Sequence, residues 1–98
     1  MNREEIITTV LRCLRVICKM KGITDTQSFD ESTLLIGSEA AILDSLGAVM
    51  LLVQVEEALN ALYEKQTALV QRLLTDDLES ETVGTLADRV LLIMGDPQ

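Results

Sequence analysis

The stretch LGAVMLLVQVEEAL, which runs from Leu46 to Leu59, has the strongest structural signal in the chain. At the rotation of about 100° per residue of an α-helix, its apolar residues fall into two groups on opposite sides of one helix. The first group is Ala48, Leu51, Leu52, Val55 and Leu59, with Leu62 just beyond, and the second is Leu46, Val49, Met50 and Val53, with Glu57 at its end. A surface helix normally has one apolar stripe. A domain this small cannot easily bury both groups, so the second one needs an explanation.

Three interpretations of the second group are open. It is a docking surface for other proteins, or it is covered by the segment 64–79, or the protein dimerises through it. Helical geometry separates the two groups and does not choose among these interpretations.

The same periodicity predicts a helix on either side of this central one. From residue 3 to about residue 21, apolar residues recur at helical spacing, and Gly22 follows as a stop. The central helix is expected to begin at Asp44 and Ser45 and to end near residue 62. A last helix is predicted from a Thr82 cap to about residue 94.

The two remaining segments lack a clear helical period. Residues 23–43 are predicted to form a long ordered loop, and a loop of this length in a small domain is usually functional. Residues 64–79 are ambiguous between a further helix near 68–74 and a turn at 76–77. No alternation typical of strands is visible. We therefore expect one domain, 1–98, of the all-α class: a small bundle of three long helices plus a short or extended third element.

Composition excludes several classes of function. The 98 residues include 16 acidic and 8 basic side chains, a formal charge of −8 and a pI near 4.3, so binding to nucleic acid or to an anionic membrane is not expected. The longest apolar run, residues 48–53, is far shorter than the roughly 20 residues that span a bilayer. No histidine is present, which removes the usual general base and the usual zinc ligand. The acidic residues at 76–81 lack the spacing of an EF-hand, and no metal site is predicted.

The two cysteines, Cys13 and Cys18, are predicted to be reduced and to act as small hydrophobic side chains. Five residues apart on one helix, they point in directions about 140° apart and cannot form a disulfide within it. Reduced cysteines, and an N-terminus without the features of a signal peptide, predict a cytoplasmic protein.

Asp44 and Ser45 stand at the start of the central helix, directly after the long loop. One interpretation is a helix cap, because both residue types are favoured there. The other is that the Ser45 hydroxyl carries a phosphodiester, an anion that the N–H groups and the partial positive charge at a helix start would stabilise. These residues alone do not distinguish between the two.

A wider pattern resembles the acyl carrier proteins, which carry 4′-phosphopantetheine on a serine. It comprises Leu43-Asp44-Ser45-Leu46-Gly47, then Val49, Leu51-Leu52-Val53 and Val55-Glu56-Glu57. The segment Thr82-Val83-Gly84-Thr85-Leu86-Ala87-Asp88-Arg89-Val90 resembles the last helix of that family. The resemblance extends over roughly residues 3–60 and 80–94 and implies an acyl-carrier-like four-helix bundle.

The resemblance also implies a function in which the chain itself is not an enzyme. A separate phosphopantetheinyl transferase, using coenzyme A and Mg²⁺, would attach 4′-phosphopantetheine to Ser45, and the thiol of this arm would hold an acyl group as a thioester. Acyl-loading, acyl-modifying and acyl-transfer enzymes would dock on the helix that begins at this serine. Docking of partners on this helix selects the docking interpretation of the second apolar group over the covering and dimerisation interpretations. We therefore expect a monomer. The implied docking residues are Asp44, Leu46, Val49, Met50, Val53, Glu56 and Glu57.

Some features depart from the carriers of ordinary fatty acid synthesis. Ile42 stands where those carriers usually have glycine, Gly47 and Met50 stand where they usually have acidic residues, and the stretch 60–80 is longer than their usual connection. We therefore expect docking that depends less on charge and more on apolar contact. A free-standing carrier of a specialised fatty acid, polyketide-type or aminoacyl pathway fits these departures.

Two other functions are weighed against the carrier. One is a helical interaction module that is never modified and docks partners through Leu46, Val49, Met50 and Val53. The other is an enzyme with Ser45 as nucleophile, which needs an activating base. Lys19 and Lys65 are the candidates for that base, and nothing in the sequence places either near Ser45.

Overall fold

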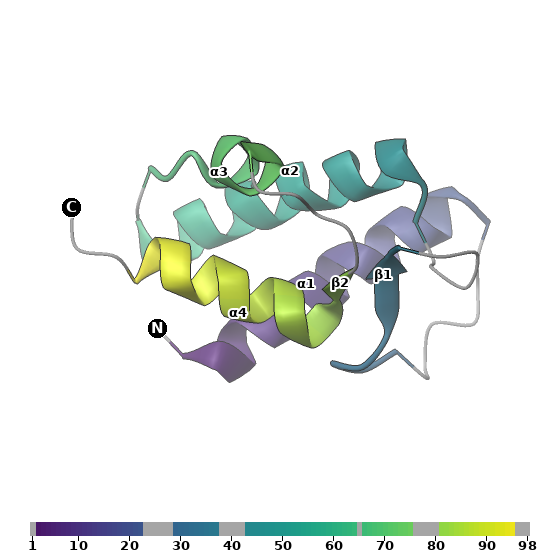
Figure 1. Ribbon diagram of the computed structural model, residues 1–98, viewed down its shortest axis with the longest axis horizontal. Coiled ribbons are helices and arrows are strands. Elements are labelled where there is room, and N and C mark those ends of the chain that lie inside the picture. The colour runs from purple at the N-terminus through teal and green to yellow at the C-terminus, as the bar shows by residue number, and fades with distance from the viewer. Residues whose placement is uncertain (1, 23–28, 38–42, 65, 76–80, 96–98) are drawn as a thin grey trace.

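The computed structural model describes residues 2–22, 29–37, 43–64, 66–75 and 81–95. Most of these residues are helical, and a small sheet accompanies the helices. Figure 1 shows α1 crossing behind α4, α2 along the top of the view, α3 against α2, and the sheet beside the start of α4. The predicted helical bundle is therefore confirmed in its overall architecture. In chain order the elements are α1 (Arg3–Met20), β1 (Leu34–Ile36), α2 (Ser45–Tyr63), α3 (Leu69–Thr75), β2 (Glu81–Thr82) and α4 (Val83–Met94).

Helix α1 forms where its sequence predicts, because its caps and its apolar period are local features. The Asn2 side chain accepts a hydrogen bond of 2.8 Å from the backbone N–H of Glu5, one of the groups left open at a helix start. After Lys21, Gly22 takes φ 82°, a left-handed conformation that glycine adopts without strain. Both cysteines are free and buried, as predicted. The buried residues of α1 are Ile6, Thr9, Val10, Cys13, Leu14, Ile17 and Cys18.

The core lies between α1, α2 and α4, and α3 closes one side of it. Helix α1 contacts both α2 and α4, and α3 contacts the same two helices. Burial of apolar area, the main driving force for folding, is therefore concentrated on one side of each long helix. From α2 the core takes Ala48, Leu51, Leu52, Val55 and Leu59, and from α4 it takes Val83, Leu86, Ala87, Val90, Ile93 and Met94.

The segment after α2, which the sequence leaves ambiguous, contains the short helix α3. Its Leu69 and Leu73, one turn apart, are fully buried. Seven residues are too few for a stable isolated helix, so packing holds α3 in place. The side chain of Asn60 accepts hydrogen bonds from the backbone N–H of Thr67 at 3.2 Å and from its hydroxyl at 2.7 Å, which fixes the chain between α2 and α3. The predicted turn at 76–77 lies outside the described residues.

The two-stranded sheet corrects the prediction of an all-α chain. Leu34 pairs with Thr82 and Ile36 with Glu81 in an antiparallel arrangement. Strands of three and two residues are too short to show an alternating pattern, so the sequence had no signal for them. Strand β1 lies in the predicted loop and is anchored by the fully buried Leu35. The parts of that loop at 23–28 and 38–42 lie outside the described residues.

Helix α4 begins with the cap that the sequence predicts. Thr82 and Thr85 form a capping box, in which each side chain accepts a hydrogen bond from the backbone N–H of the other. Arg3 then ties the ends of the fold together: its Nη1 lies 2.8 Å from Glu31 Oε2, and its Nε lies 2.6 Å from Asp88 Oδ1. The start of α1, the segment before β1 and the middle of α4 are thereby joined.

Candidate functional site

Ser45 is the first residue of α2, and Asp44 is the N-cap, as predicted. Asp44 has an extended backbone, with φ −82° and ψ −177°, and its Oδ1 accepts a hydrogen bond of 2.7 Å from the backbone N–H of Gly47. This hydrogen bond is the main reason why the pKa of Asp44 is lowered from its ordinary value, because it stabilises the ionised form. The charged carboxylate therefore holds the first turn of α2.

A second contact reaches the same carboxylate from the end of α1. Lys21 Nζ lies 3.2 Å from Asp44 Oδ1 and contributes further to the lowered pKa of that carboxyl. The two residues are 23 positions apart in the sequence. Their pairing joins the C-cap residue of α1 to the N-cap residue of α2. The sequence analysis missed Lys21, because no local pattern connects it with Asp44.

Gly47 is the point where this ion pair packs against α2. A Cβ at this position would lie 3.1 Å from both Asp44 Oδ1 and Lys21 Nζ, and 3.3 Å from Leu43 Cδ2. A side chain at this position would require the neighbouring Asp44 or Lys21 side chain to shift by a few tenths of an ångström. The absence of a side chain at Gly47 therefore suits the close approach of the ion pair to α2.

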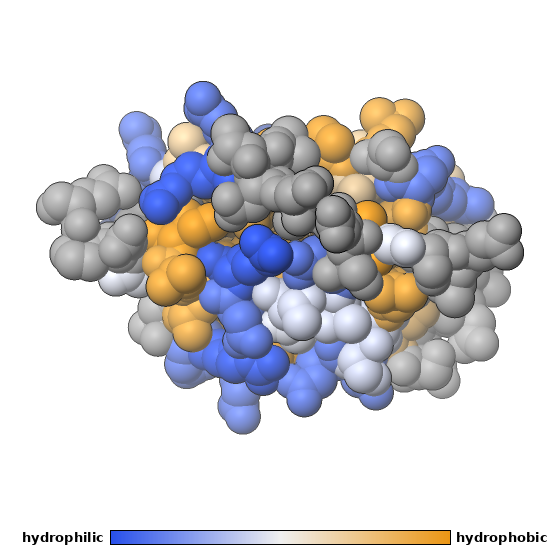
Figure 2. Space-filling view, in the orientation of Figure 1, coloured by the Kyte–Doolittle hydropathy of each residue, from blue (hydrophilic) through white to orange (hydrophobic). Residues whose placement is uncertain are grey.

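The two apolar groups of α2 are separated in the structure as the sequence predicts. The first group faces the core, and its members are at most 7% exposed up to Leu59. On the opposite side Leu46 is 70% exposed, Val49 36% and Val53 38%, whereas Met50 is half-buried. We call this side, made of Leu46, Val49, Met50, Val53 and Glu57, the outer face. Figure 2 shows apolar atoms protruding at the upper right of the molecule, where α2 begins.

Leu62 differs in exposure from the other members of the first apolar group. This residue is 56% exposed, although its position on the helix is close to that of the buried group. It lies in the last turn of α2 and lines a surface hollow together with residues of α1, among them Glu5 near its start and Arg12 in its middle. Helical period gives the direction of a side chain, whereas its burial depends on which neighbouring element reaches it.

Helix α3 does not cover the outer face. It packs on α2 beside Glu56, whose Oε1 accepts a hydrogen bond of 3.3 Å from the backbone N–H of Val70. Among the described residues, the covering interpretation of the second apolar group is therefore wrong, and docking and dimerisation remain. The two glutamates among the predicted docking residues also differ: Glu56 is half-buried and faces α3, whereas Glu57 is exposed on the outer face.

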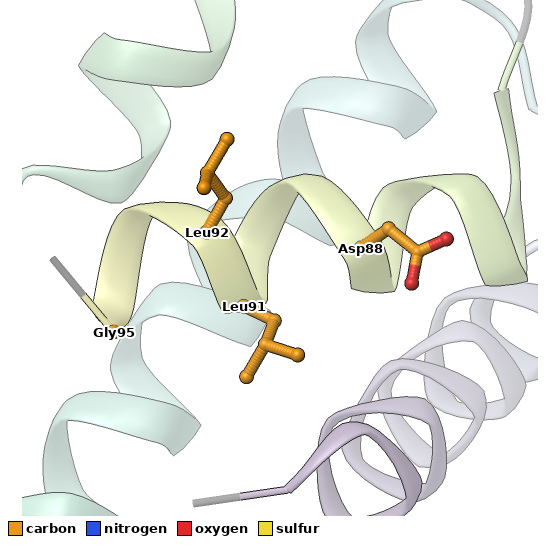
Figure 3. A pocket seen from close by; sticks show the side chains of 4 residues that line it. All are labelled: Asp88, Leu91, Leu92 and Gly95. Atoms are coloured by element: carbon orange, nitrogen blue, oxygen red, sulfur yellow. The ribbon is translucent and has the colours of Figure 1, made fainter.

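Three surface hollows among the described residues are lined by residues other than Ser45. One, of about 340 Å³, is lined by Asp88, Leu91 and Leu92 of α4 and by Gly95, which follows this helix (Figure 3). Leu91 and Leu92 point to different sides of the helix there, and Leu92 is 76% exposed. Another, of about 540 Å³, follows the line between α1 and α2 and includes Glu57. Neither has a group of residues arranged for catalysis.

Two further tests concern metals and membranes. The described residues contain no group of three or more Asp, Glu, Cys or His side chains that could hold a metal ion. Within the same part of the chain, Leu46–Tyr63 is long and apolar enough to cross a membrane, with a mean hydropathy of 1.3. The core helix of a globular fold passes the same test, and α2 has such a buried side.

The candidate base Lys65 lies outside the described residues. Lys21, not Lys19, contacts the residue before Ser45. Comparison of the chain with protein-family models, with curated proteins and with solved structures gave no match.

Proposed function

We propose that this chain is a carrier protein that receives 4′-phosphopantetheine on the hydroxyl of Ser45. The observation that carries the proposal is the combination of a serine as first residue of the long helix α2 with an exposed apolar face on the same helix. A helix start capped by Asp44 accounts for a serine at position 45, but it does not explain why α2 keeps apolar side chains in water on the side opposite its core.

The start of α2 fits a phosphodiester. The helix has 19 residues, so the peptide dipoles and the open N–H groups of its first turn provide the partial positive charge that favours an anion on Ser45. Gly47 lets the Lys21–Asp44 pair lie close to the start of α2, and Asp44 holds the first turn in place through its hydrogen bond to the Gly47 N–H. The arm would supply a thiol that holds an acyl group as a thioester.

The contribution of the chain itself is presentation, not catalysis. Leu46, Val49 and Val53 would contact a phosphopantetheinyl transferase first, and afterwards the enzymes that load, modify and transfer the acyl group. No carboxylate stands on the outer face before Glu57, so these contacts would be mainly apolar. A specialised pathway fits this surface better than ordinary fatty acid synthesis does, and we place the carrier in the cytoplasm as a monomer.

Intact mass spectrometry tests the modification. The folded protein is incubated with coenzyme A, Mg²⁺ and a phosphopantetheinyl transferase of broad specificity, and we expect the mass to increase by one phosphopantetheinyl group. Ser45→Ala should gain no mass while keeping the helical circular dichroism spectrum. Ser32→Ala, a change at an exposed serine elsewhere, is the matched control and should be loaded like the parent. A folded parent protein that gains no mass, or loading of Ser45→Ala, contradicts the proposal.

The second candidate is the unmodified interaction module, and the same outer face supports it. The two functions differ in one result: the module binds its partner through Leu46, Val49, Met50 and Val53 without any gain of mass. Mass spectrometry of the protein isolated from its native host therefore separates them, and it also identifies any acyl group on the arm.

A further inference from the structure

We propose that Lys21 determines which partner enzymes this carrier accepts. By pairing with Asp44, it neutralises the carboxylate that directly precedes Ser45 in the chain, so that the start of α2 favours partners with an apolar docking surface over partners with a basic one. The inference rests on the proposed carrier function and goes beyond it, because it assigns partner selection to a residue of another helix.

The contact between the two residues is built into the fold. The Asp44 side chain is 68% exposed and open to a partner, whereas the Lys21 side chain is only 33% exposed. One oxygen, Asp44 Oδ1, accepts from both Lys21 Nζ and the Gly47 N–H. A Cβ at Gly47 would lie 3.1 Å from both charged groups, so the lack of a side chain there lets the pair lie close against α2.

Few charged residues lie near Asp44 in the sequence of α2, so the Lys21–Asp44 pair has a large effect on the charge at the start of this helix. From Leu43 to Val55, Asp44 is the only charged residue in the sequence. Glu56 is directed to α3, and Glu57 follows Ser45 by twelve residues, about 18 Å along the helix axis. That separation exceeds the screening length of about 8 Å at physiological salt. The chain has a net charge of −8, yet the stretch from Leu43 to Val55 carries no net charge once Lys21 pairs with Asp44.

Removal of Lys21 should therefore uncover the Asp44 carboxylate. Exposed ion pairs change binding by a small factor, so we expect a transferase with a basic docking surface to show a KM about two- to fivefold lower for Lys21→Ala than for the parent. The kcat should change little, because Ser45 and the reacting phosphate are the same. The gain in affinity should disappear at high salt, since screening weakens contacts between exposed charges.

The experiment measures the kinetics of phosphopantetheine transfer from coenzyme A to the parent, Lys21→Ala, Lys21→Arg and Lys19→Ala, at low and high salt. Lys21→Arg keeps the cation and should behave like the parent. Lys19→Ala removes the same charge from the same helix, two residues away, and is the matched control for net charge. As a readout independent of loading, NMR titration should find a higher pKa for Asp44 in Lys21→Ala than in the parent or in Lys19→Ala.

Each outcome decides one of the two proposals. A parent protein that is folded but never loaded removes the carrier function itself. A parent that is loaded normally, with a KM for Lys21→Ala that is unchanged, raised, or lowered only as much as for Lys19→Ala, overturns the role of Lys21 alone. An Asp44 pKa that does not respond to Lys21→Ala overturns it as well.

Discussion

Replacement of one leucine on each side of α2 by alanine tests the two-sided character of this helix. Leu52 is 1% exposed, and Leu→Ala at buried positions costs about 2–5 kcal/mol, so we expect a loss of about 3 kcal/mol for Leu52→Ala. Leu46 is 70% exposed, and full burial of a leucine is worth about 1.5–3 kcal/mol. Because less than a third of the Leu46 surface is removed from water, Leu46→Ala should lower the free energy of unfolding by less than about 1 kcal/mol.

Urea unfolding followed by far-UV circular dichroism measures both free energies, since the chain has no tryptophan for fluorescence. For a domain of this size, the melting temperature should fall by roughly 10–25 °C for Leu52→Ala and by less than about 8 °C for Leu46→Ala. The unfolding slope should be the same in both variants, because neither changes the surface exposed on unfolding by much.

Protein concentration separates docking from dimerisation. If the outer face is free in the isolated protein, the stability of the parent and of Leu46→Ala does not depend on concentration. A dimer formed through the outer face would make the parent more stable at higher concentration. Equal losses for Leu46→Ala and Leu52→Ala would refute the assignment of Leu46 to an exposed face.

Two further predictions concern groups away from α2's outer face. The Tyr63 hydroxyl donates to the Glu5 carboxylate, which raises the pKa of Tyr63 to about 12, so its contribution to stability is present below pH 10 and is lost as the pH rises from 10 through 12. Absorbance titration of this single tyrosine should show a midpoint that returns toward 10 in Glu5→Gln, and identical midpoints would disprove the contact. Arg89→Ala should cost about 3 kcal/mol, because Glu81 is 2% exposed and would lose the cation whose Nε lies 2.5 Å from its Oε1. Glu81→Gln should cost less in the same urea assay, since it leaves no buried charge, and the reverse order would count against a buried carboxylate at this position.

The helices are the part of the fold that the sequence predicts well. The bounds of α1, α2 and α4, the Asp44 and Thr82 caps, and the separation of Leu46 from Leu52 on α2 all depend on residues within a few positions of one another. The hydrogen bonds of a helix connect residues that are close in the sequence. The apolar period and the caps of a helix can therefore be recognised from a short stretch of sequence. Of the candidate site, Asp44 as cap and the separation of the two apolar sides of α2 were predictable for this reason.

Other features depend on residues that are distant in the sequence. The pairing of β1 with β2, the place of α3 beside Glu56, the exposure of Leu62 and the contact of Lys21 with Asp44 each require two segments to meet in space. The residue type at one position does not determine which distant segment of the chain packs against it. The sequence by itself determined a helical chain with a capped central helix and two opposed apolar sides, because these are local properties. Only the tertiary structure decided which side is covered and which charge lies beside Ser45, because both result from packing between elements.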